Sequence, residues 1–497
     1  MAVRIHERRL LTLPLDPLSD TPRFRQLYEA LRREILNGRL PPGARLPATR
    51  GFASELGISR NTVLAAYAQL LAEGYLEGKL GSGTYVPRAL PEEMIQARRT
   101  TESARPRPSK RRALSQRGKL LTTTSRTAHR FPGVPRPFRP GIPALEAFPF
   151  DIWMRLVARH HRRPPRELLT YDDPAGYAPL RRAIAEHLGL VRAVHCDPEQ
   201  VLVITGSQQG LDLVARILLD PGDSAWVEEP GYPSARAVLQ GAGVRWVPVP
   251  VDGDGLDVEA GSARCRDARL VYITPSHQYP LGVTMSLARR LALLDWAARA
   301  DAWVVEDDYD SEFRYAGRPL AALQGLDGDG RVIYLGTFSK ALFPSLRLGY
   351  LVVPPDLVDA FVAARDVIDR QTSTLTQAVV ADFLLEGHFL RHIRRMRTLY
   401  QDRQETLLRA ARRELGGLVQ VSPSATGLHL VGWLESGRDD RQASLAAARV
   451  GVEAPPLSRY CVEPPKRGGL VLGYAGSDPR QTRDAVRKLG QALRPRG

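Results

Sequence analysis

The amino-acid sequence predicts a multidomain protein, in which a small, mainly helical domain with two short strands precedes a much larger α/β domain that ends in a small α+β part. Three observations carry this prediction. The chain has 497 residues, enough for about three domains of roughly 150 residues each. Helical patterns dominate residues 23–73, whereas strand and helix patterns alternate from residue 138 onward. Between them, residues 88–135 are rich in Pro, Ser, Thr and Arg without apolar periodicity, which is typical of a flexible linker.

Charge is the unusual feature of the composition. The formal net charge is +16, which points to nucleic acid or another anionic surface as a partner. Residues 88–130 hold twelve Lys and Arg against three Glu, and so carry +9 of that charge. Two interpretations of this basic linker stay open. It is either a merely solvated spacer or a tether that adds non-specific, salt-dependent affinity for flanking DNA.

Cysteine usage and the N-terminus bear on the compartment. Cys196, Cys265 and Cys461 are too few and too scattered for a disulfide framework or a zinc site, which favours a reducing environment. The opening MAVRIHERRL is charged where a signal peptide requires an apolar core, and no run of eighteen apolar residues occurs. We therefore expect a cytoplasmic protein without a membrane segment.

The N-terminal pattern predicts three short helices. Apolar residues of 23–38 fall on one helical face, and Asn37-Gly38 provides a stop. A Pro/Gly turn then leads to a second helix, Thr49 to Leu56, closed by Gly57. Ser59 or Asn61 can cap a third helix that runs to about Glu73. Two short helices joined by a glycine-containing turn have helix-turn-helix spacing.

Two small strands should follow the third helix. Tyr75-Leu76 and Tyr85-Val86 flank the glycine-rich turn of residues 81–83, which is the layout of a wing. Residues 20–87 closely resemble the winged helix-turn-helix domain of GntR-type regulators, with L-P-P-G-x-x-L-P, S-R-N-T-V and G-S-G-T-Y-V in that order. The resemblance implies double-stranded promoter DNA as a partner.

Such a domain reads the grooves of DNA. Arg60, Asn61 and Thr62 lie in the first turn of the third helix, the part that reaches base edges. Ser59 and the backbone amides beside it can bind phosphate. The wing and the start of the second helix are positioned for the DNA backbone or the minor groove. The DNA-binding candidates are Arg50, Ser59, Arg60, Asn61, Thr62, Lys79, Ser82 and Thr84.

The large domain, residues 136–497, should divide at about residue 389 into a large part and a small C-terminal part that contains short strands such as GLHLVGW. In the large part, polar residues follow successive apolar strands. VLVITGSQQG predicts a strand, a turn and a helix whose first amides, at Ser207 and Gln208, would form a phosphate site. Because ligands of open α/β sheets bind at the carboxyl ends of strands, we expect these polar residues to line one pocket.

Lys340 stands just past a buried strand, Val332 to Leu335, which Gly336 should end. A solvated lysine is the simpler interpretation of any one such residue. Here the hydroxyls of Thr337 and Ser339 and the guanidinium of Arg347 surround the amine in sequence. That combination suits a phosphate-bearing aldehyde, with which the amine would form a Schiff base.

Residues 331–350 resemble the cofactor lysine segment of fold-type-I, pyridoxal-phosphate-dependent aminotransferases, and Y-x-D-P-x-G-x-x-x-L-R-x-A-I from Tyr171 onward resembles their entry segment. The resemblance implies pyridoxal 5'-phosphate held as an internal aldimine on Lys340. It also implies that Asp307 pairs with the pyridinium nitrogen, that Tyr309 bonds the ring oxygen and that Tyr232 stacks on the ring. Tyr171 resembles the tyrosine that reaches the phosphate of a neighbouring subunit, so the pocket would be dimeric.

Two departures from the aminotransferase pattern affect the candidate residues. In place of N-P-T-G the chain has Y-P-L-G from Tyr279, so we expect His277 or Gln278 to take over the role of the asparagine. The terminal segment that usually supplies the carboxylate-binding arginine reads LGYAG, which leaves Arg459 as the nearest replacement and Arg236 as a second candidate.

A metal site is the alternative for the acidic run EDDYD that contains Asp307. No histidine or spaced third carboxylate accompanies this run in the sequence, so we expect no metal there.

A GntR-type winged helix joined to an aminotransferase-like domain is the architecture of the MocR/GabR-type transcription regulators, which the chain resembles over nearly its whole length. The resemblance implies a homodimer in which an amine or amino-acid effector, or pyridoxal phosphate itself, changes DNA binding. Two alternatives stay open. One is a working aminotransferase with an accessory DNA-binding domain, and the other is a cofactor-free dimerisation platform.

Overall fold

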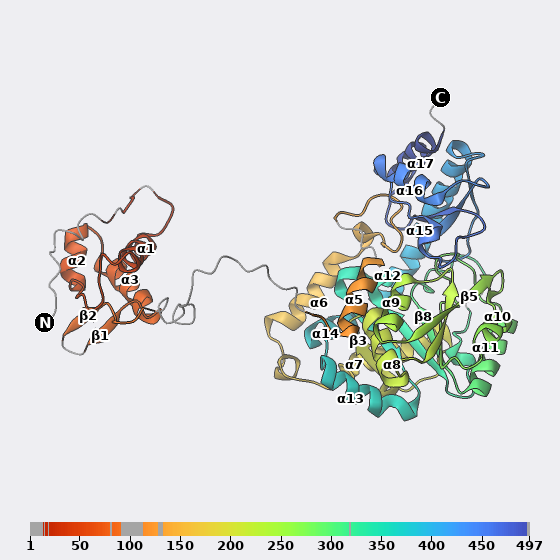
Figure 1. The fold of residues 1–497 in the computed structure, drawn as a ribbon, viewed down its shortest axis with the longest axis horizontal. Helices are drawn as coiled ribbons and strands as arrows, with labels where there is room; N and C mark the ends of the chain where they lie inside the picture. The colour runs from red at the N-terminus through yellow and green to blue at the C-terminus, as the bar shows by residue number, and fades with distance from the viewer. Residues whose placement is uncertain are drawn as a thin grey trace. The chain divides into compact units, whose positions relative to one another are not determined.

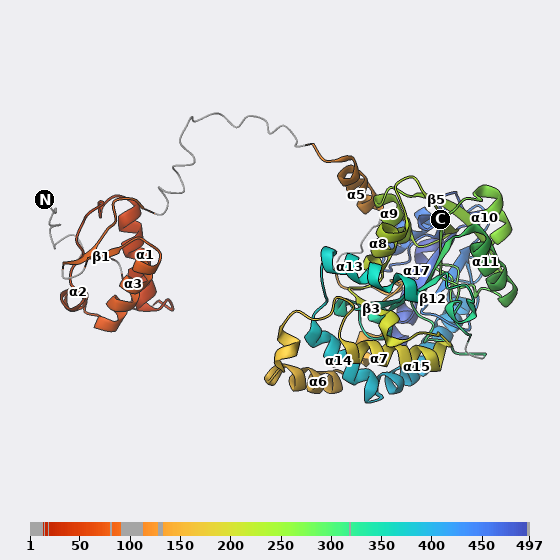
Figure 2. The ribbon, with the colours of Figure 1, turned by 90° about the horizontal axis from the view of Figure 1, so that it is seen from below.

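The computed structural model describes residues 13, 15–17, 19–79, 82–90, 113–127, 133–317 and 320–494, with no side-chain description for 123–127. The chain divides into two compact units, Met1–Arg112 and Ala113–Gly497, which are drawn in Figures 1 and 2. Much of the expected basic linker, residues 91–112 and 128–132, lies outside the described residues, as does Gly81 of the expected wing turn.

The N-terminal unit contains the three helices that the sequence predicts. They are α1 (Arg23–Leu36), α2 (Thr49–Leu56) and α3 (Arg60–Ala72). Gly57 ends α2 in the left-handed conformation that glycine tolerates, with φ of 64°. Ser59 caps α3, because its hydroxyl accepts a hydrogen bond of 3.1 Å from the backbone N–H of Thr62. Apolar side chains of all three helices form one core.

The wing differs slightly from the expectation. Its antiparallel strands are β1 (Glu77–Lys79) and β2 (Gly83–Tyr85), so the first strand begins two residues later than predicted. Tyr75 and Leu76 instead end the helical region, where both backbone N–H groups bond the carbonyl of Leu70. Their side chains are buried in the core of the unit, which explains their apolar character.

The second unit is built on an eight-stranded sheet in the order β3-β10-β9-β8-β7-β4-β5-β6. β4, β5, β7, β8 and β9 are parallel, whereas β10 is antiparallel to both β3 and β9, and β6 is antiparallel to β5. The strands are β3 (Val201–Ile204), β4 (Ser224–Glu229), β5 (Arg245–Asp252), β6 (Gly255–Leu256), β7 (Leu270–Ile273), β8 (Trp303–Asp308), β9 (Val332–Thr337) and β10 (Gly349–Val352).

Helices cover both faces of this sheet, which is why its central strands read as continuous apolar runs. Alternate residues of β3 face opposite ways. Val201 and Val203 join a core with α6, α7, α14 and α15, whereas Leu202 and Ile204 join a core with α8, α9 and α13. The two groups of helices lie on opposite sides in Figure 2. The helices of the large part are α6 (Phe150–Arg162), α7 (Ala178–Arg192), α8 (Ser207–Leu218), α9 (Pro233–Gly241), α10 (Val258–Arg264), α11 (Leu287–Ala300), α12 (Phe338–Ala341), α13 (Val358–Ile368) and α14 (Thr374–Leu385).

A smaller antiparallel sheet forms the C-terminal part, as the sequence predicts. Its strands are β11 (Val419–Val421), β12 (His429–Leu434) and β13 (Gly469–Gly473), in that order. The accompanying helices are α15 (His388–Glu414), α16 (Asp440–Arg449) and α17 (Pro479–Leu493), drawn in blue in Figure 1.

The expected linker is not irregular throughout. Its second half contains α5 (Gln116–Thr127), which packs against α9 in both views of the ribbon (Figures 1 and 2). A Cβ added at Gly241 of α9 would lie 2.7 Å from Cδ2 of Leu121. The helix escaped the sequence analysis because its apolar residues are few and its contact lies far along the chain. Among the described helices, none has the length and the apolar character needed to cross a membrane.

Candidate functional site

Lys340 lies in a short helix directly after β9. The strand continues two residues beyond the predicted end, through Gly336 to Thr337. The hydroxyl of Thr337 then caps α12 by accepting a 3.2 Å hydrogen bond from the backbone N–H of Ser339. The amine of Lys340 donates a 2.8 Å hydrogen bond to the carbonyl of Gly141. This arrangement places a lysine at the carboxyl end of a central strand, inside the protein.

The Lys340 side chain lines a cavity of about 320 Å³. Most of the predicted cofactor-binding residues meet there, although they come from widely separated segments. Those that line the cavity are Ser207, Gln208, Tyr232, Tyr279, Asp307, Tyr309, Thr337, Ser339, Lys340 and Arg347. The sequence analysis missed several further wall residues, including Gly141, Tyr272, Thr274, Asp310 and His429.

One end of the cavity is suited to an anion. α8 begins at Ser207, and the first N–H groups of a helix have no partner within the helix. Gly206 approaches Arg347 so closely that an added Cβ would lie 3.3 Å from its guanidinium. Helix amides, the Ser207 and Ser339 hydroxyls and the Arg347 guanidinium thus surround one end. A phosphate group fits this set of donors.

The lining also carries a carboxylate with an unused oxygen. Oδ2 of Asp307 accepts a 2.6 Å hydrogen bond from the Tyr272 hydroxyl. Oδ1 is buried and has no hydrogen-bond partner among the described residues. Burial raises the pKa of the Asp307 carboxyl to about 7, although the hydrogen bond from Tyr272 and the charge of Lys340 act in the opposite direction. A cationic N–H group, such as that of a pyridinium ring, fits the unused oxygen.

Burial also acts on the lysine. It lowers the pKa of the Lys340 amine, while the carboxylates of Asp310 and Asp307 oppose that shift. The neutral amine is the form that attacks an aldehyde. Donors for an anion, an amine and a carboxylate with an unpartnered oxygen therefore line one cavity.

Aromatic side chains form the wall between these groups. The ring of Tyr279 makes edge contacts with Tyr232, Tyr309 and His429 at centroid distances of 5.2 to 5.9 Å. Its hydroxyl donates to that of Tyr460 at 3.2 Å. The Tyr309 hydroxyl lies 2.9 Å from Nδ1 of His277.

His277 and Gln278, the two replacements expected for the asparagine, lie behind this wall. The Gln278 amide nitrogen donates to the carbonyls of Pro230 and Tyr279, both at 2.8 Å, and its oxygen accepts from the N–H of Leu281. The amide is therefore already engaged, partly in its own turn and partly with the distant Pro230 carbonyl. The His277 ring contacts the cavity residues Tyr309, Asp310 and His429.

The predicted carboxylate-binding arginines do not line the cavity. Arg236 donates to the carbonyl of Tyr460 at 2.9 Å and lies 3.5 Å from Oε2 of Glu229. Arg459 is in the short turn Leu457–Arg459, next to Tyr460. Tyr171 does not line the cavity either. It is 80% exposed, with the Arg370 guanidinium 4.8 Å above its ring.

The fold brings to the acidic run two histidines that lie far from it in the sequence. The fold brings His277 and His429 beside Asp310, so that one ligand atom of each lies within 4.8 Å of the others. Neither histidine is near Asp310 in the sequence. Pairing of β7 with β8 brings His277 to Asp310, and packing of the small sheet against the large part adds His429.

The DNA-binding candidates lie on the N-terminal unit. Arg50, Arg60 and Asn61 are exposed. Ser59 and Thr62 are used in the helix cap, where their hydroxyls lie 2.8 Å apart. On the wing, Lys79 pairs with Glu77 at 3.3 Å, and the Ser82 hydroxyl lies 2.6 Å from that of Tyr85. Thr84 occupies the centre of β2.

Comparison with known proteins agrees with this architecture. Residues 24–86 match the model of bacterial regulatory proteins of the gntR family, and residues 148–489 match that of aminotransferase class I and II. The chain is 45% identical to the probable rhizopine catabolism regulatory protein MocR of Rhizobium meliloti, over 97% of this chain and 96% of that protein. The chain belongs to the MocR-type transcriptional regulators. It is also 33% identical to the pyridoxine biosynthesis regulator PdxR of Corynebacterium glutamicum, over 97% and 98% of the two chains.

The large domain of this MocR-type regulator has enzymes among its structural neighbours. LysN, the α-aminoadipate aminotransferase of Thermus thermophilus, shares 33% identity and a TM-score of 0.66, over 72% of this chain and 91% of LysN. These matches confirm the predicted fold class, the DNA-binding regulator class and pyridoxal phosphate as the cofactor. The regulators match nearly the whole chain, whereas the aminotransferase matches mainly the large domain.

Proposed function

We propose that this MocR-type regulator senses an amine at the cavity around Lys340 and transmits its binding to the winged helix-turn-helix domain. The observation that carries the proposal is the cavity itself. An amine, donors suited to an anion and a buried carboxylate whose second oxygen has no partner among the described residues all line this one cavity. When bound, pyridoxal phosphate supplies an aldehyde carbon that exchanges one amine for another.

Each wall residue then has a role toward the cofactor. Lys340 binds the aldehyde, and Asp307 holds the proton on the ring nitrogen. Tyr309, positioned by His277, donates to the ring oxygen, while Tyr232 and Tyr279 contact the ring. The phosphate site consists of Ser207, Gln208, Thr337, Ser339 and Arg347.

The effector would be an amine, an amino acid or pyridoxal phosphate itself. The names of two relatives support both an amine-type effector and pyridoxal phosphate. One name refers to rhizopine catabolism and the other to pyridoxine biosynthesis. Arg459 is our candidate for an effector carboxylate, since the neighbouring Tyr460 bonds Tyr279 in the cavity wall. Arg236, which bonds the carbonyl of Tyr460, is the second candidate.

We further propose a homodimer that works in the cytoplasm, where chromosomal DNA is accessible. Tyr171 is highly exposed and does not line its own cavity, and Leu169 and Val367 nearby are exposed as well. A partner subunit would cover this apolar surface and receive Tyr171 at its phosphate site.

Active transamination is the second candidate function. The likeness to LysN and the presence of Lys340, Asp307 and Tyr309 in one cavity favour it. We favour a sensor with at most partial transamination, because Y-P-L-G replaces N-P-T-G and no arginine besides Arg347 lines the cavity among the described residues.

The decisive experiment uses the full chain and DNA from upstream of the neighbouring genes. We expect bound pyridoxal phosphate to absorb visible light, and Lys340→Ala to remove that absorbance. In the wild type, amines that alter the spectrum should also alter the affinity of the protein for this DNA. In Lys340→Ala, the same amines should leave that affinity unchanged. An unchanged spectrum in Lys340→Ala would contradict the cofactor site. Sustained turnover of an amino donor and an oxo acid would instead identify an enzyme.

A further inference from the structure

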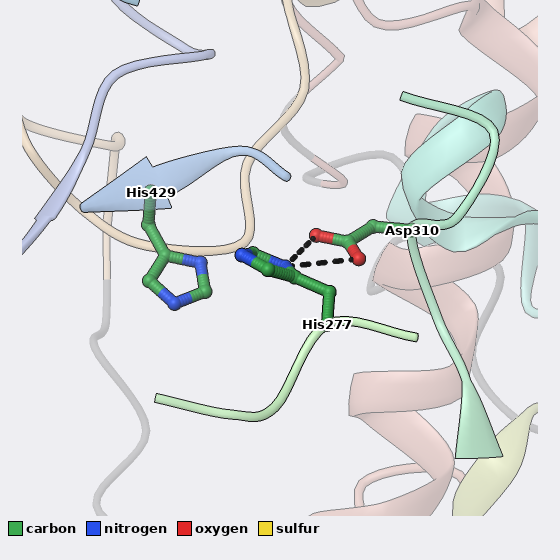
Figure 3. Close-up of side chains that lie close together, drawn as sticks. All are labelled: His277, Asp310 and His429. Carbon is green, nitrogen blue, oxygen red and sulfur yellow. Dashed lines mark hydrogen bonds and ion pairs between the residues drawn. The ribbon is translucent and has the colours of Figure 1, made fainter. Parts of the chain in front are cut away.

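Three side chains of metal-binding type meet at the edge of the Lys340 cavity. His277, Asp310 and His429 are all buried, and one ligand atom of each lies within 4.8 Å of the others (Figure 3). His277 follows β7 and Asp310 follows β8 in the large part of the domain, whereas His429 opens β12 of the small part. Asp310 and His429 line the cavity.

Hydrogen bonds determine which nitrogen of each imidazole is available. Nδ1 of His277 lies 2.9 Å and 3.1 Å from the two carboxylate oxygens of Asp310, so it donates its proton there. The Tyr309 hydroxyl, 2.9 Å from the same nitrogen, shares that proton. Nε2 of His277 is thereby left with a lone pair. It is buried and has no hydrogen-bond partner among the described residues.

His429 is oriented in the same manner. Its Nε2 donates a 3.0 Å hydrogen bond to the backbone carbonyl of Pro280, which leaves the lone pair on Nδ1. Figure 3 shows this nitrogen facing the free nitrogen of His277. Two lone pairs that face each other cannot bond one another directly, so a cation or a donor placed between them would satisfy both.

We propose that Nε2 of His277 and Nδ1 of His429 bind a divalent transition-metal ion such as Zn²⁺. Metal-binding histidines usually donate their second N–H to a carboxylate or a backbone carbonyl, and Asp310 and Pro280 provide one of each. Two imidazoles favour Zn²⁺, Cu²⁺ or Ni²⁺ over Mg²⁺ and Ca²⁺, which prefer oxygen ligands. Water from the cavity completes the coordination.

Tetrahedral Zn²⁺ with bonds of about 2.0 to 2.1 Å needs its two nitrogens roughly 3.4 Å apart, and the ligand atoms of the cluster lie within 4.8 Å of one another. Two glycines border the His277 ring. Gly282 borders Nε2 of His277, where an added Cβ would lie 3.2 Å away. Gly427 lies against the same ring, where an added Cβ would lie 1.9 Å from Cε1. Because the two histidines belong to different parts of the domain, the ion would join the small part to the large part.

The test is Zn²⁺ binding to tag-free, full-length protein that has been treated with a chelator. Competition with a chromogenic chelator should show about one Zn²⁺ per chain, unaffected by excess Mg²⁺. We expect His277→Gln and His429→Gln to abolish this binding, and Asp310→Asn to weaken it by about 10- to 100-fold. His195→Gln is the matched control, because His195 is exposed and is not part of the cluster.

Two results would overturn the proposal. One is the absence of saturable Zn²⁺ binding by the wild type, which would leave the pair as a hydrogen-bonding site for water. The other is equal loss of binding in His195→Gln and in the cluster variants. A crystal of the wild type soaked in Zn²⁺ gives an independent measurement, since the anomalous peak should lie between His277 and His429. A peak elsewhere would also refute the assignment, whether or not the variants fold.

Discussion

The hydroxyl of Tyr272 donates a 2.6 Å hydrogen bond to one oxygen of Asp307, and the other oxygen of this buried carboxylate has no partner among the described residues. A carboxylate held in this way is ready for a cationic ring nitrogen. The unpartnered oxygen destabilises the cofactor-free protein. The same oxygen would bind the ring nitrogen in the loaded protein.

Asp307→Asn should weaken cofactor binding, because a charge-assisted hydrogen bond is replaced by a neutral one. Such bonds contribute about 1.5 to 3 kcal/mol, so we expect the dissociation constant of pyridoxal phosphate to rise by roughly 10- to 100-fold. Equilibrium dialysis monitored by visible absorbance measures it. Asp356→Asn, at an exposed position, is the control and should bind normally. Unchanged affinity in Asp307→Asn would refute the pairing with the ring.

The stability of the cofactor-free protein should depend on Asp307 between pH 4 and pH 7. Burial raises the pKa of this carboxyl to about 7, so the folded state binds its proton more tightly than the unfolded state does. The folded state consequently loses stability as the pH rises through this range, by up to about 4 kcal/mol. We expect Asp307→Asn to melt at a higher temperature than the wild type at pH 8, with a smaller difference at pH 5. A difference in melting temperature that does not depend on pH would contradict this role of the Asp307 carboxyl.

Arg347→Ala should discriminate between two aldehydes. The guanidinium lies at the anion end of the cavity, close to Gly206. Its loss removes a charged partner of the phosphate, so affinity for pyridoxal phosphate should fall by roughly 10- to 100-fold. Affinity for pyridoxal, which has no phosphate, should hardly change. Equal losses for both aldehydes would show that Arg347 acts on something other than the phosphate.

Arg60→Ala should weaken specific DNA binding without affecting the cofactor. Arg60 is exposed at the first residue of α3, where a recognition helix reaches base edges. We expect a loss of about 1 to 3 kcal/mol at the operator. Fluorescence anisotropy with operator and random DNA measures it, and exposed Glu55→Gln is a control for the folding of the unit. Equal loss on random DNA would indicate a phosphate contact instead of base reading.

Arg192→Met should destabilise the large domain. Arg192 is buried and donates to Asp308 at 2.9 Å and to the Ser276 hydroxyl at 2.6 Å. Removing it leaves the buried Asp308 carboxylate without its cation, a change that typically costs about 3 to 5 kcal/mol. Thermal melting should show the loss, and the double variant Arg192→Met with Asp308→Asn should recover part of it. No recovery would mean that the packing of the arginine matters more than its charge.

Local patterns predicted much of this molecule. A buried strand followed by polar residues identified Lys340 and Ser207 at strand ends, and the Ser59 cap and Gly57 stop outlined α3 and α2. Such features depend on hydrogen bonds and side-chain periodicity within a few residues, so they can be recognised in the sequence. The first wing strand was predicted two residues too early. The apolar side chains of Tyr75 and Leu76, which suggested a strand, pack in the core of the N-terminal unit instead.

By itself, the sequence determined the order of the domains, the strand ends that carry the chemistry and the family. Only the tertiary structure showed that Lys340 bonds Gly141 across 199 residues, that Arg236 is engaged by the Tyr460 carbonyl, and that His429 faces His277 beside Asp310. These contacts depend on how distant strands and helices pack against one another. No pattern within any one of these segments specifies that packing, since the packing follows from burying the apolar faces of the whole domain together.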